Sequence, residues 1–547
     1  MRAVLCLLSL LLTACAGETA RKDAAAPLFT DLGNHHHAIT TASPLAQRYF
    51  DQGLTLAFGF NHAEAERSFR QAAALDPACA MCWWGVALVL GPNINVPMDP
   101  AAAAPAWEAI GKARERADAA SAIERAYIEA LARRYAPQPP ADRSPLDQAF
   151  AAAAGEVARK YPQDLDARAL YAEALLDQHP WDYYDAAGKP RRESTRLIVS
   201  TLESVLKDDP RHAWAIHLYI HATEASDRPQ RAEAYADRLT VLVPGAGHLV
   251  HMPGHTYMRV GRYHDAVLAN ERATAADDSY LAQCQQQGVY PIGYVPHNHH
   301  FLYAAAAMLG NRAEALKAAA STDAHTAHGL LHDPGFGTSL QHYSVQPLFA
   351  YVRFGEWQRI LAQPEPAADL PYPAGVRHYA RGRAHAALGE LDAADRDLAA
   401  LEAVIADPAL AQAGNVSSYN SAVDLLRIAA AVLGGEIAAQ RQDWRQAVAR
   451  LTEGVKREDA LHYNEPSDWN YPVRHSLGAV LLAAGRPAEA ERVYREDLRR
   501  NPDNGWSLFG LMASLDAQKK RSQVREVRER LVDAWRWADI ELTGSRL

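Results

Sequence analysis

Two stretches of 34 residues carry the same arrangement of small residues: GHLVHMPGHTYMRVGRYHDAVLANERATAADDSY at 247–280 and YPVRHSLGAVLLAAGRPAEAERVYREDLRRNPDN at 471–504. Both have glycine at the eighth and fifteenth positions and alanine at the twentieth. Small residues at fixed positions let two helix backbones approach closely, and Pro502 ends the second helix of its copy. Each stretch therefore predicts a pair of packed helices joined by a turn.

Further copies of this pattern extend over most of the chain. The copy at 46–79 has small, aromatic and proline residues at matching positions, namely Gly53, Ala65, Phe69, Ala72 and Pro77. The pattern resembles the tetratricopeptide repeat (TPR), in which each helical hairpin leaves an apolar face that the next hairpin covers. Weaker copies start near residues 80, 131, 165, 213, 296, 341, 375, 428 and 505. The resemblance implies an all-α fold, a right-handed superhelix (α-solenoid) of about a dozen TPR-like hairpins with inserted loops.

Three insertions interrupt the repeats and suggest a division of the chain. They lie at 179–192, at 277–296 and at 321–340, and the last contains His325, His328 and His332. Long ordered insertions in compact arrays are often functional lids or binding loops. We expect an N-terminal TPR-like array at 45–273, histidine-rich insertions around one TPR-like hairpin at 274–340, and a C-terminal TPR-like array at 341–547.

The first residues have the features of a targeting signal. A basic start and a short apolar stretch precede Leu12-Thr13-Ala14-Cys15, which resembles the bacterial lipobox. This resemblance implies a lipoprotein signal peptide at 1–14, a lipidated Cys15 and a flexible tether at 15–44 that includes His35, His36 and His37. The expected location is the bacterial cell envelope, with a lipid anchor in the outer membrane and the protein facing the periplasm. An ordinary cleaved signal is the alternative.

Composition excludes several other classes of protein. The chain has 547 residues and a formal net charge of -9, which argues against a nucleic-acid partner because phosphate contacts need clustered Lys and Arg. Five cysteines are too few for a disulfide scaffold. Cys79 and Cys82 are candidates for a local disulfide in an oxidising compartment, with metal ligation or redox chemistry as alternatives. No phosphate-binding loop is present, so no nucleotide cofactor is expected.

Histidines recur in register with the repeats. His217 and His221 take the fifth and ninth positions of one repeat, and His251 and His255 take the same positions 34 residues later. Positions spaced by three and four residues share one face of a helix. In TPR folds this face of the first helix lines the concave groove, so the resemblance implies a strip of imidazoles facing the ligand.

Such a strip is suited to a transition metal. Neutral imidazole binds copper, zinc, iron and nickel, and we expect copper or zinc, less readily iron. The predicted ligands are the quartet His217, His221, His251 and His255 with His300, and the secondary ligands are His248, His297, Glu224 and Met258. Pro253 weakens the prediction because an interior proline kinks a helix and could separate His251 from His255. Polar lining for an organic or peptide ligand, or structural packing, is the alternative role.

Three functions follow from these observations. The first is an envelope scaffold that grips a peptide or partner protein in its groove, and the second is a metal-binding lipoprotein. The third is a metal-dependent enzyme, a hydrolase or an oxidoreductase, with Glu224 as candidate catalytic base. No linear catalytic motif distinguishes the third from the second, since an open metal position needs none.

Overall fold

The computed structural model describes residues 26–284 and 288–547. In these ranges every regular element is a helix, and two isolated bridges, Tyr184–Pro190 and Asn415–Ser421, are the only β pairing. The predicted all-α array of helical hairpins is confirmed. The signal peptide at 1–14 and the candidate lipid site Cys15 lie outside the described residues.

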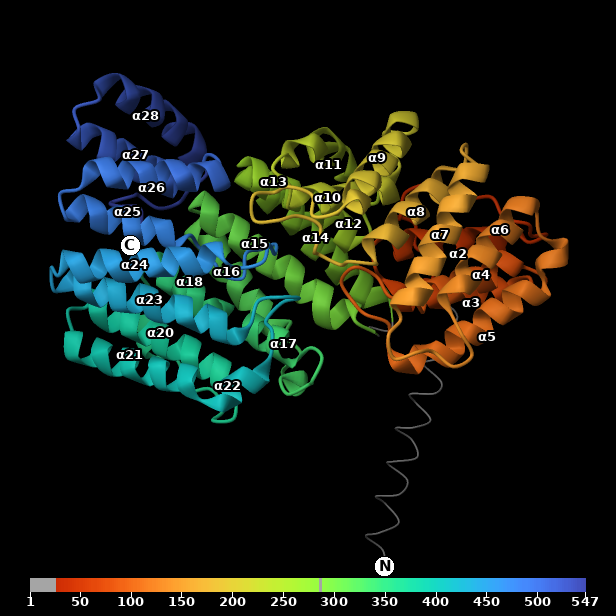
Figure 1. Cartoon of the computed structure of the whole chain (residues 1–547), viewed down its shortest axis with the longest axis horizontal. Coiled ribbons are helices and arrows are strands. Elements are labelled where there is room, and N and C mark those ends of the chain that lie inside the picture. Colours follow the sequence, from red (N-terminus) through yellow and green to blue (C-terminus); the bar gives the residue numbers. More distant parts are fainter. Residues whose placement is uncertain (1–25, 285–287) are drawn as a thin grey trace, which may run out of the picture.

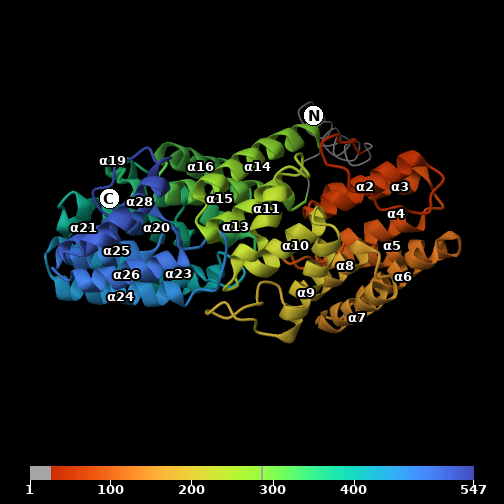
Figure 2. The ribbon, with the colours of Figure 1, turned by 90° about the horizontal axis from the view of Figure 1, so that it is seen from above.

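The helices follow one another through an elongated molecule, and the last of them return to the middle of the chain, where the Trp506 indole donates to the Ala307 carbonyl (Figures 1 and 2). The first part contains α2 (Pro44–Phe58), α3 (His62–Leu75), α4 (Ala80–Val89), α5 (Ala103–Glu115), α6 (Ala122–Leu131), α7 (Ser144–Lys160), α8 (Leu165–Leu176), α9 (Glu193–Asp208), α10 (Ala213–Glu224), α11 (Glu233–Leu239), α12 (Gly247–His251), α13 (Pro253–Val260) and α14 (Tyr263–Gln283). The second part contains α15 (Val295–Leu309), α16 (Arg312–Ala324), α17 (Gly337–Ser344), α18 (Gln346–Phe354), α19 (Trp357–Leu361), α20 (Pro371–Ala387), α21 (Leu391–Ala406), α22 (Pro408–Ala413), α23 (Ala422–Gln440), α24 (Trp444–Asp459), α25 (Val473–Ala483), α26 (Pro487–Arg500), α27 (Gly505–Ala517) and α28 (Arg521–Trp535).

Close approach of neighbouring helices depends on glycines that face aromatic rings. Phe69 of α3 lies between Gly53 of α2 and Gly85 of α4, and a Cβ at these glycines would come within 2.6 and 2.4 Å of its ring. The same arrangement recurs around Tyr494 of α26, between glycines of α25 and α27. These contacts explain why the repeat pattern places a glycine before a large aromatic residue: the ring fills the space that the missing side chain leaves.

The hairpin turns share one backbone feature. In eight of them a residue with positive φ lies two positions before the second helix, namely Phe60, Gly261, Gly310, Gly355, Gly389, Gln442, Gly485 and Lys519. Glycine adopts this conformation without steric cost, which accounts for its predominance. Phe60 is the only aromatic residue in this set, so its side chain must serve a purpose that outweighs the strain.

The segment 26–43, which we expected to belong to a flexible tether, packs against the array. The Tyr49 hydroxyl donates to the Ala26 carbonyl, and the Gly245 amide donates to the Asp31 carbonyl at 2.8 Å. His37 Nδ1 lies 2.7 Å from Asp166 Oδ2. These contacts hold the segment because they join it to α2, to α8 and to the loop before α12.

Asp166 is the main anchor of this segment. His35 and His212 also place Nε2 atoms 3.3 and 3.0 Å from its carboxylate oxygens. His212 Nδ1 accepts the Ala215 amide, so its Nε2 carries the proton and faces Asp166. Although His37, Asp164 and Asp166 have the spacing of metal ligands, this hydrogen-bond direction favours an ion-paired cluster. Burial opposes ionisation of Asp166, but the histidines hold its pKa well below the usual range.

The pairing of His37 with Asp166 makes the stability depend on pH. Burial lowers the pKa of His37, but the hydrogen bond and charge of Asp166 raise it overall above 6.5. The contribution of His37 to the free energy of unfolding is therefore complete below pH 6.5 and is lost as pH rises through its raised pKa. The contribution of Asp166 is lost at the other end, as pH falls below the usual pKa range of an aspartate. We expect His37→Gln to lower the free energy of unfolding most near pH 5 to 6 and progressively less toward pH 8. Urea denaturation at several pH values measures this difference, and a deficit independent of pH would contradict it.

Two features bear on the expected compartment. Cys79 and Cys82 are joined by a disulfide at the start of α4. Among the described residues, no helix combines the length and the apolarity needed to cross a bilayer.

Candidate metal centre

Helix α10 places two histidines side by side in the interior. His217 and His221 are one helical turn apart, their ring centroids lie 4.8 Å apart, and both side chains are buried. All twelve residues of α10 are buried, because α2, α8, α9, α11 and α13 surround it. The prediction that His217 and His221 share one face of a helix is therefore correct, but neighbouring helices cover this face.

Pro253 divides the next helix without separating its histidines. Helix α12 ends at His251, and Pro253 begins α13, where a proline costs no hydrogen bond. His251 and His255 nevertheless converge, with their Nε2 atoms 2.8 Å apart. The expectation that the proline would make these two imidazoles diverge is wrong, because the break falls between two helices that stay nearly in register.

Two groups of three histidines result. The first triad is His217, His221 and His248; the second triad is His251, His255 and His297. Within each triad, one potential ligand atom of each residue lies within 4.8 Å of the others. His297 comes from α15, and its Nε2 lies 3.1 Å from that of His251. Three helices that are separate in sequence therefore supply the second triad.

Hydrogen bonds to the outer nitrogens orient the second triad for a cation. Asn270 Nδ2 donates to the Ala266 carbonyl, so its Oδ1 faces His251 and accepts a proton from Nδ1 at 2.7 Å. His255 Nδ1 likewise donates to Glu224 at 2.6 Å. When both rings are neutral, their Nε2 atoms present lone pairs to each other. A second proton on His251 would relieve this, but burial and the neighbouring His255 hold its pKa well below 6.5. A metal ion held by the two nitrogens satisfies both lone pairs, as does a proton shared between them in a hydrogen bond.

Glu224 accepts hydrogen bonds from both triads. One carboxylate oxygen accepts from His221 Nδ1 at 2.8 Å and the other from His255 Nδ1, so each triad contributes one ring. Tyr463 also donates to this carboxylate at 3.1 Å. Burial opposes its charge, but His255 and His221 hold the pKa of Glu224 far below its usual range. Glu224 is thus an ionised carboxylate that fixes imidazole orientation, which argues against its predicted role as catalytic base.

In the first triad, too, the Nε2 atoms are the candidate metal ligands. With Nδ1 of His221 committed to Glu224, its buried Nε2 has no hydrogen-bond partner among the described residues. His217 and His248 approach each other through Nε2 at 3.2 Å. Burial is the main cause that lowers the pKa of each of the three rings, so they are neutral at pH 7. Neutral imidazole is the form that binds metals.

Aromatic side chains wall the first triad. Phe60 packs against His217 and His248 at ring distances of 4.7 and 5.4 Å. Trp181 packs edge-on against His221 at 5.2 Å, and its φ is 63°. Strained backbone of this kind persists where the surroundings enforce it and is frequent at functional sites. Two bulky residues with positive φ, Phe60 and Trp181, therefore pack against the first triad.

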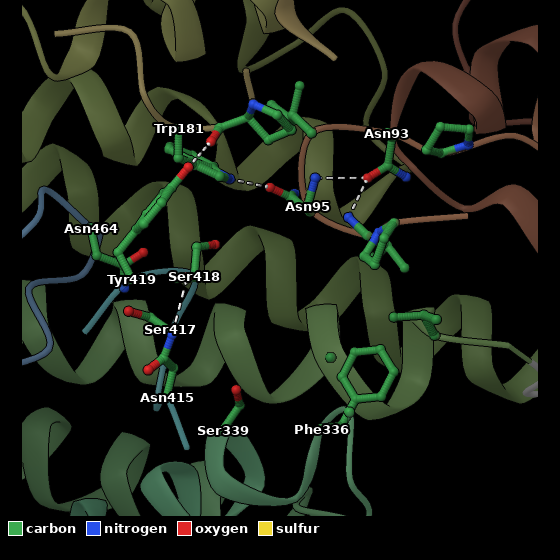
Figure 3. A pocket seen from close by; sticks show the side chains of 18 of the residues that line it. Asn93, Asn95, Trp181, Phe336, Ser339, Asn415, Ser417, Ser418, Tyr419 and Asn464 are labelled. Carbon is green, nitrogen blue, oxygen red and sulfur yellow. Dashed lines mark hydrogen bonds between the residues drawn. The ribbon is translucent and has the colours of Figure 1, made fainter. Parts of the chain in front are cut away.

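A cavity of about 1260 Å³ adjoins both triads. Four triad histidines line it, two from each triad, and the three insertions and the segments 92–100, 413–419 and 464–468 contribute to the rest of its wall. Figure 3 shows Trp181 and Tyr419 side by side at this wall, with the Trp181 indole donating to Asn95. The other labelled residues are mostly neutral and polar: Asn93, Ser339, Asn415, Ser417, Ser418 and Asn464, with Phe336. Charged side chains, among them Arg143, Asp147, Glu465 and Asp468, also belong to the lining.

Several asparagines of the wall stabilise the loops themselves. Asn95 bonds to Trp181 and Tyr294, Asn415 donates to the Ser418 carbonyl, and Asn464 donates to Asp468. Because their amides are engaged internally, they are poorly placed to clamp a peptide backbone.

The predicted ligands are divided differently from our expectation. The α10 members of the quartet belong to the first triad and His251 and His255 to the second, while a further candidate group joins His221 and His255 through Glu224, a predicted secondary ligand. His300 lies outside these groups: its Nε2 is 3.5 Å from Asn470 Oδ1 and its ring packs against His342. Met258 packs with the apolar core. The secondary candidates His248 and His297, both second residues of their repeats, are members of the triads.

The remaining predicted histidines lie elsewhere. His299 and His325 stack on each other at 4.4 Å, and His328 and His332 approach aspartates at the surface. None of these four belongs to a triad. The sequence could not reveal Asn270, Tyr463 or Trp181 as neighbours of the centre, because each reaches it through tertiary contacts.

Comparisons with known proteins add little. No protein-family model matches the sequence, and no curated protein matches it. Among solved structures, the human IFIT1 dimer with m7Gppp-AAAA is 13% identical, with 90% of this chain and 91% of that chain covered and a TM-score of 0.33. A chain of the APC/C hetero-tetramer Cut9-Hcn1 is 12% identical, with coverages of 90% and 94% and a TM-score of 0.28. Similarities this weak carry no information on the centre.

Proposed function

We propose that this protein binds copper or zinc in its histidine centre, beside a cavity for a small-molecule ligand. The convergence of the Nε2 atoms of His251 and His255, 2.8 Å apart, with His297 beside them carries the proposal. Both rings are held in this tautomer by acceptors at Nδ1, an arrangement typical of metal-bound histidine. Six imidazoles without a thiolate suit zinc or copper and disfavour magnesium and calcium.

The proposed compartment is the bacterial envelope. It is supported by the lipobox-like Leu12–Cys15 sequence and by the Cys79–Cys82 disulfide, which is typical of oxidising compartments. A lipid at Cys15 would place the array at the membrane surface. Mass spectrometry of the N-terminal peptide from native membranes tests this, and an unlipidated Cys15 would contradict it.

Elemental analysis tests metal binding directly. The protein should be purified without a nickel column and analysed for copper, zinc and iron. We expect near-stoichiometric metal, and we expect His217→Ala combined with His251→Ala to remove most of it while circular dichroism still shows the helices. His300→Ala is the matched control, because it removes a buried histidine of the same cavity that lies outside both triads. Absence of metal after reconstitution with each ion would refute the proposal and leave a partner or peptide as the occupant.

A metal-dependent enzyme is the second candidate. The observation that favours it is the position of the cavity, which is lined by histidines of both triads. A ligand in the cavity could therefore reach bound metal. Chelated and reloaded protein should be compared with p-nitrophenyl acetate for hydrolysis and with catechol in air for oxidation. Turnover that returns only with the metal would favour the enzyme, and its absence with both probes would favour binding alone.

A further inference from the structure

We propose that the centre holds two metal ions, one in each triad, and that both face the cavity. This inference rests on the proposed metal binding and goes further, because it assigns the number of ions and their arrangement. A single tetrahedral ion uses four ligands at most. Six convergent imidazoles exceed that number, and their grouping into two sets of three fits two ions that each keep an open position.

The arrangement of the rings supports one joint centre. Within the triads, ring centroids lie between 4.7 and 6.2 Å apart. Across the triads, His221 lies 5.4 Å from His255 and His248 lies 5.6 Å from His251. The triads are therefore as close to each other as their own members are. Two ions at these positions are near enough for one small ligand to contact both.

The cavity approaches this pair from one side. His221 and His248 of the first triad line it together with His255 and His297 of the second. His217 and His251 are not part of its lining and lie behind the other four. The open position of each ion consequently points into the cavity, and a ligand there bridges the pair.

Charge gives the ligand its chemical class. Six imidazoles bind as neutral groups, so Glu224 is the carboxylate that directly compensates the ions. It acts on both triads through one oxygen each. A second carboxylate, Glu465, is linked to Glu224 through the Tyr463 hydroxyl. Two divalent ions next to two carboxylates still leave excess positive charge in a buried site, which favours an anionic bridge such as hydroxide.

Copper(II) loading tests the number of ions. Chelated full-length protein is titrated with copper(II), and bound metal is measured after gel filtration. We expect two ions per chain for the wild type and for His300→Ala, and one for His217→Ala or His297→Ala alone. The variant that combines His217→Ala with His251→Ala should bind none. Circular dichroism identifies variants that fail to fold, and His217→Gln and His297→Gln then replace them.

Electron paramagnetic resonance tests whether the ions form a pair. Two copper(II) ions joined by a small bridge couple magnetically, so the wild-type signal should account for much less than two spins. It should return to about one spin per bound ion in His217→Ala. A wild type with one ion, or with two ions and full spin intensity, would overturn the two-ion centre but leave metal binding intact. No bound copper or zinc at all would overturn both.

Discussion

Replacing Glu224 with glutamine should weaken metal binding at both triads together. The carboxylate accepts Nδ1 protons from His221 and His255, whereas an amide offers one acceptor and turns a donor toward the other ring. One imidazole must then rotate or change tautomer, so that its Nε2 is lost as a ligand, and the imidazole of the other triad keeps only a neutral acceptor in place of a charged one. Loss of such an outer hydrogen bond typically costs about 10- to 100-fold in metal affinity. We expect a loss of this size for the second ion as well as the first, measured by competition with a chromophoric chelator.

Glu436→Gln is the control for the burial of a carboxylate. Glu436 is equally buried, but it pairs with Arg546 and Arg383 in the C-terminal array. We expect this variant to lose stability and to keep its metal affinity. Equal affinity losses in both variants would mean that Glu224 acts through general stability. A loss at one triad alone would show that the carboxylate does not couple them.

Local sequence patterns predicted the fold well, because a hairpin array is built from contacts that are short in sequence. The glycine before an aromatic residue appears in the structure as the contact of Gly53 with Phe69. Alanine and glycine at fixed repeat positions therefore predict where neighbouring helices pack closely. The segment 26–43 was misjudged for the opposite reason, since its contacts with Asp166 and Gly245 span more than a hundred residues.

The centre was predicted in part. Helical spacing correctly brought His217 next to His221, because both lie on one helix. It could not assign them to a different triad from His251, since that depends on how α10 and α12 pack. Their true partners, His248 and His297, carried the same register signal at another repeat position. A histidine in the sequence does not show which ring nitrogen is free to bind a metal. In the structure, the hydrogen bonds to Asn270 and Glu224 show this.

Replacing Phe60 with glycine should destabilise the protein although it relieves backbone strain. The φ of Phe60 is 57°, a conformation that costs a non-glycine residue about 1–2 kcal/mol. Its side chain is buried against His217 and His248, and truncating a buried phenylalanine costs about 3–5 kcal/mol. The loss of packing exceeds the relief, so we expect a net loss of about 1–4 kcal/mol in chelated protein, measured by urea denaturation.

Gln442→Gly separates the two effects. Gln442 occupies the equivalent turn position with φ of 60° and is exposed, so glycine there relieves strain without removing packing. We expect its free energy of unfolding to stay level or rise by up to about 1 kcal/mol. Phe60→Gly should in addition weaken metal binding, because the ring limits the positions open to His217 and His248. If Phe60→Gly instead matched Gln442→Gly in both stability and affinity, the strained turn would be an accident of the repeat and not a support for the first triad.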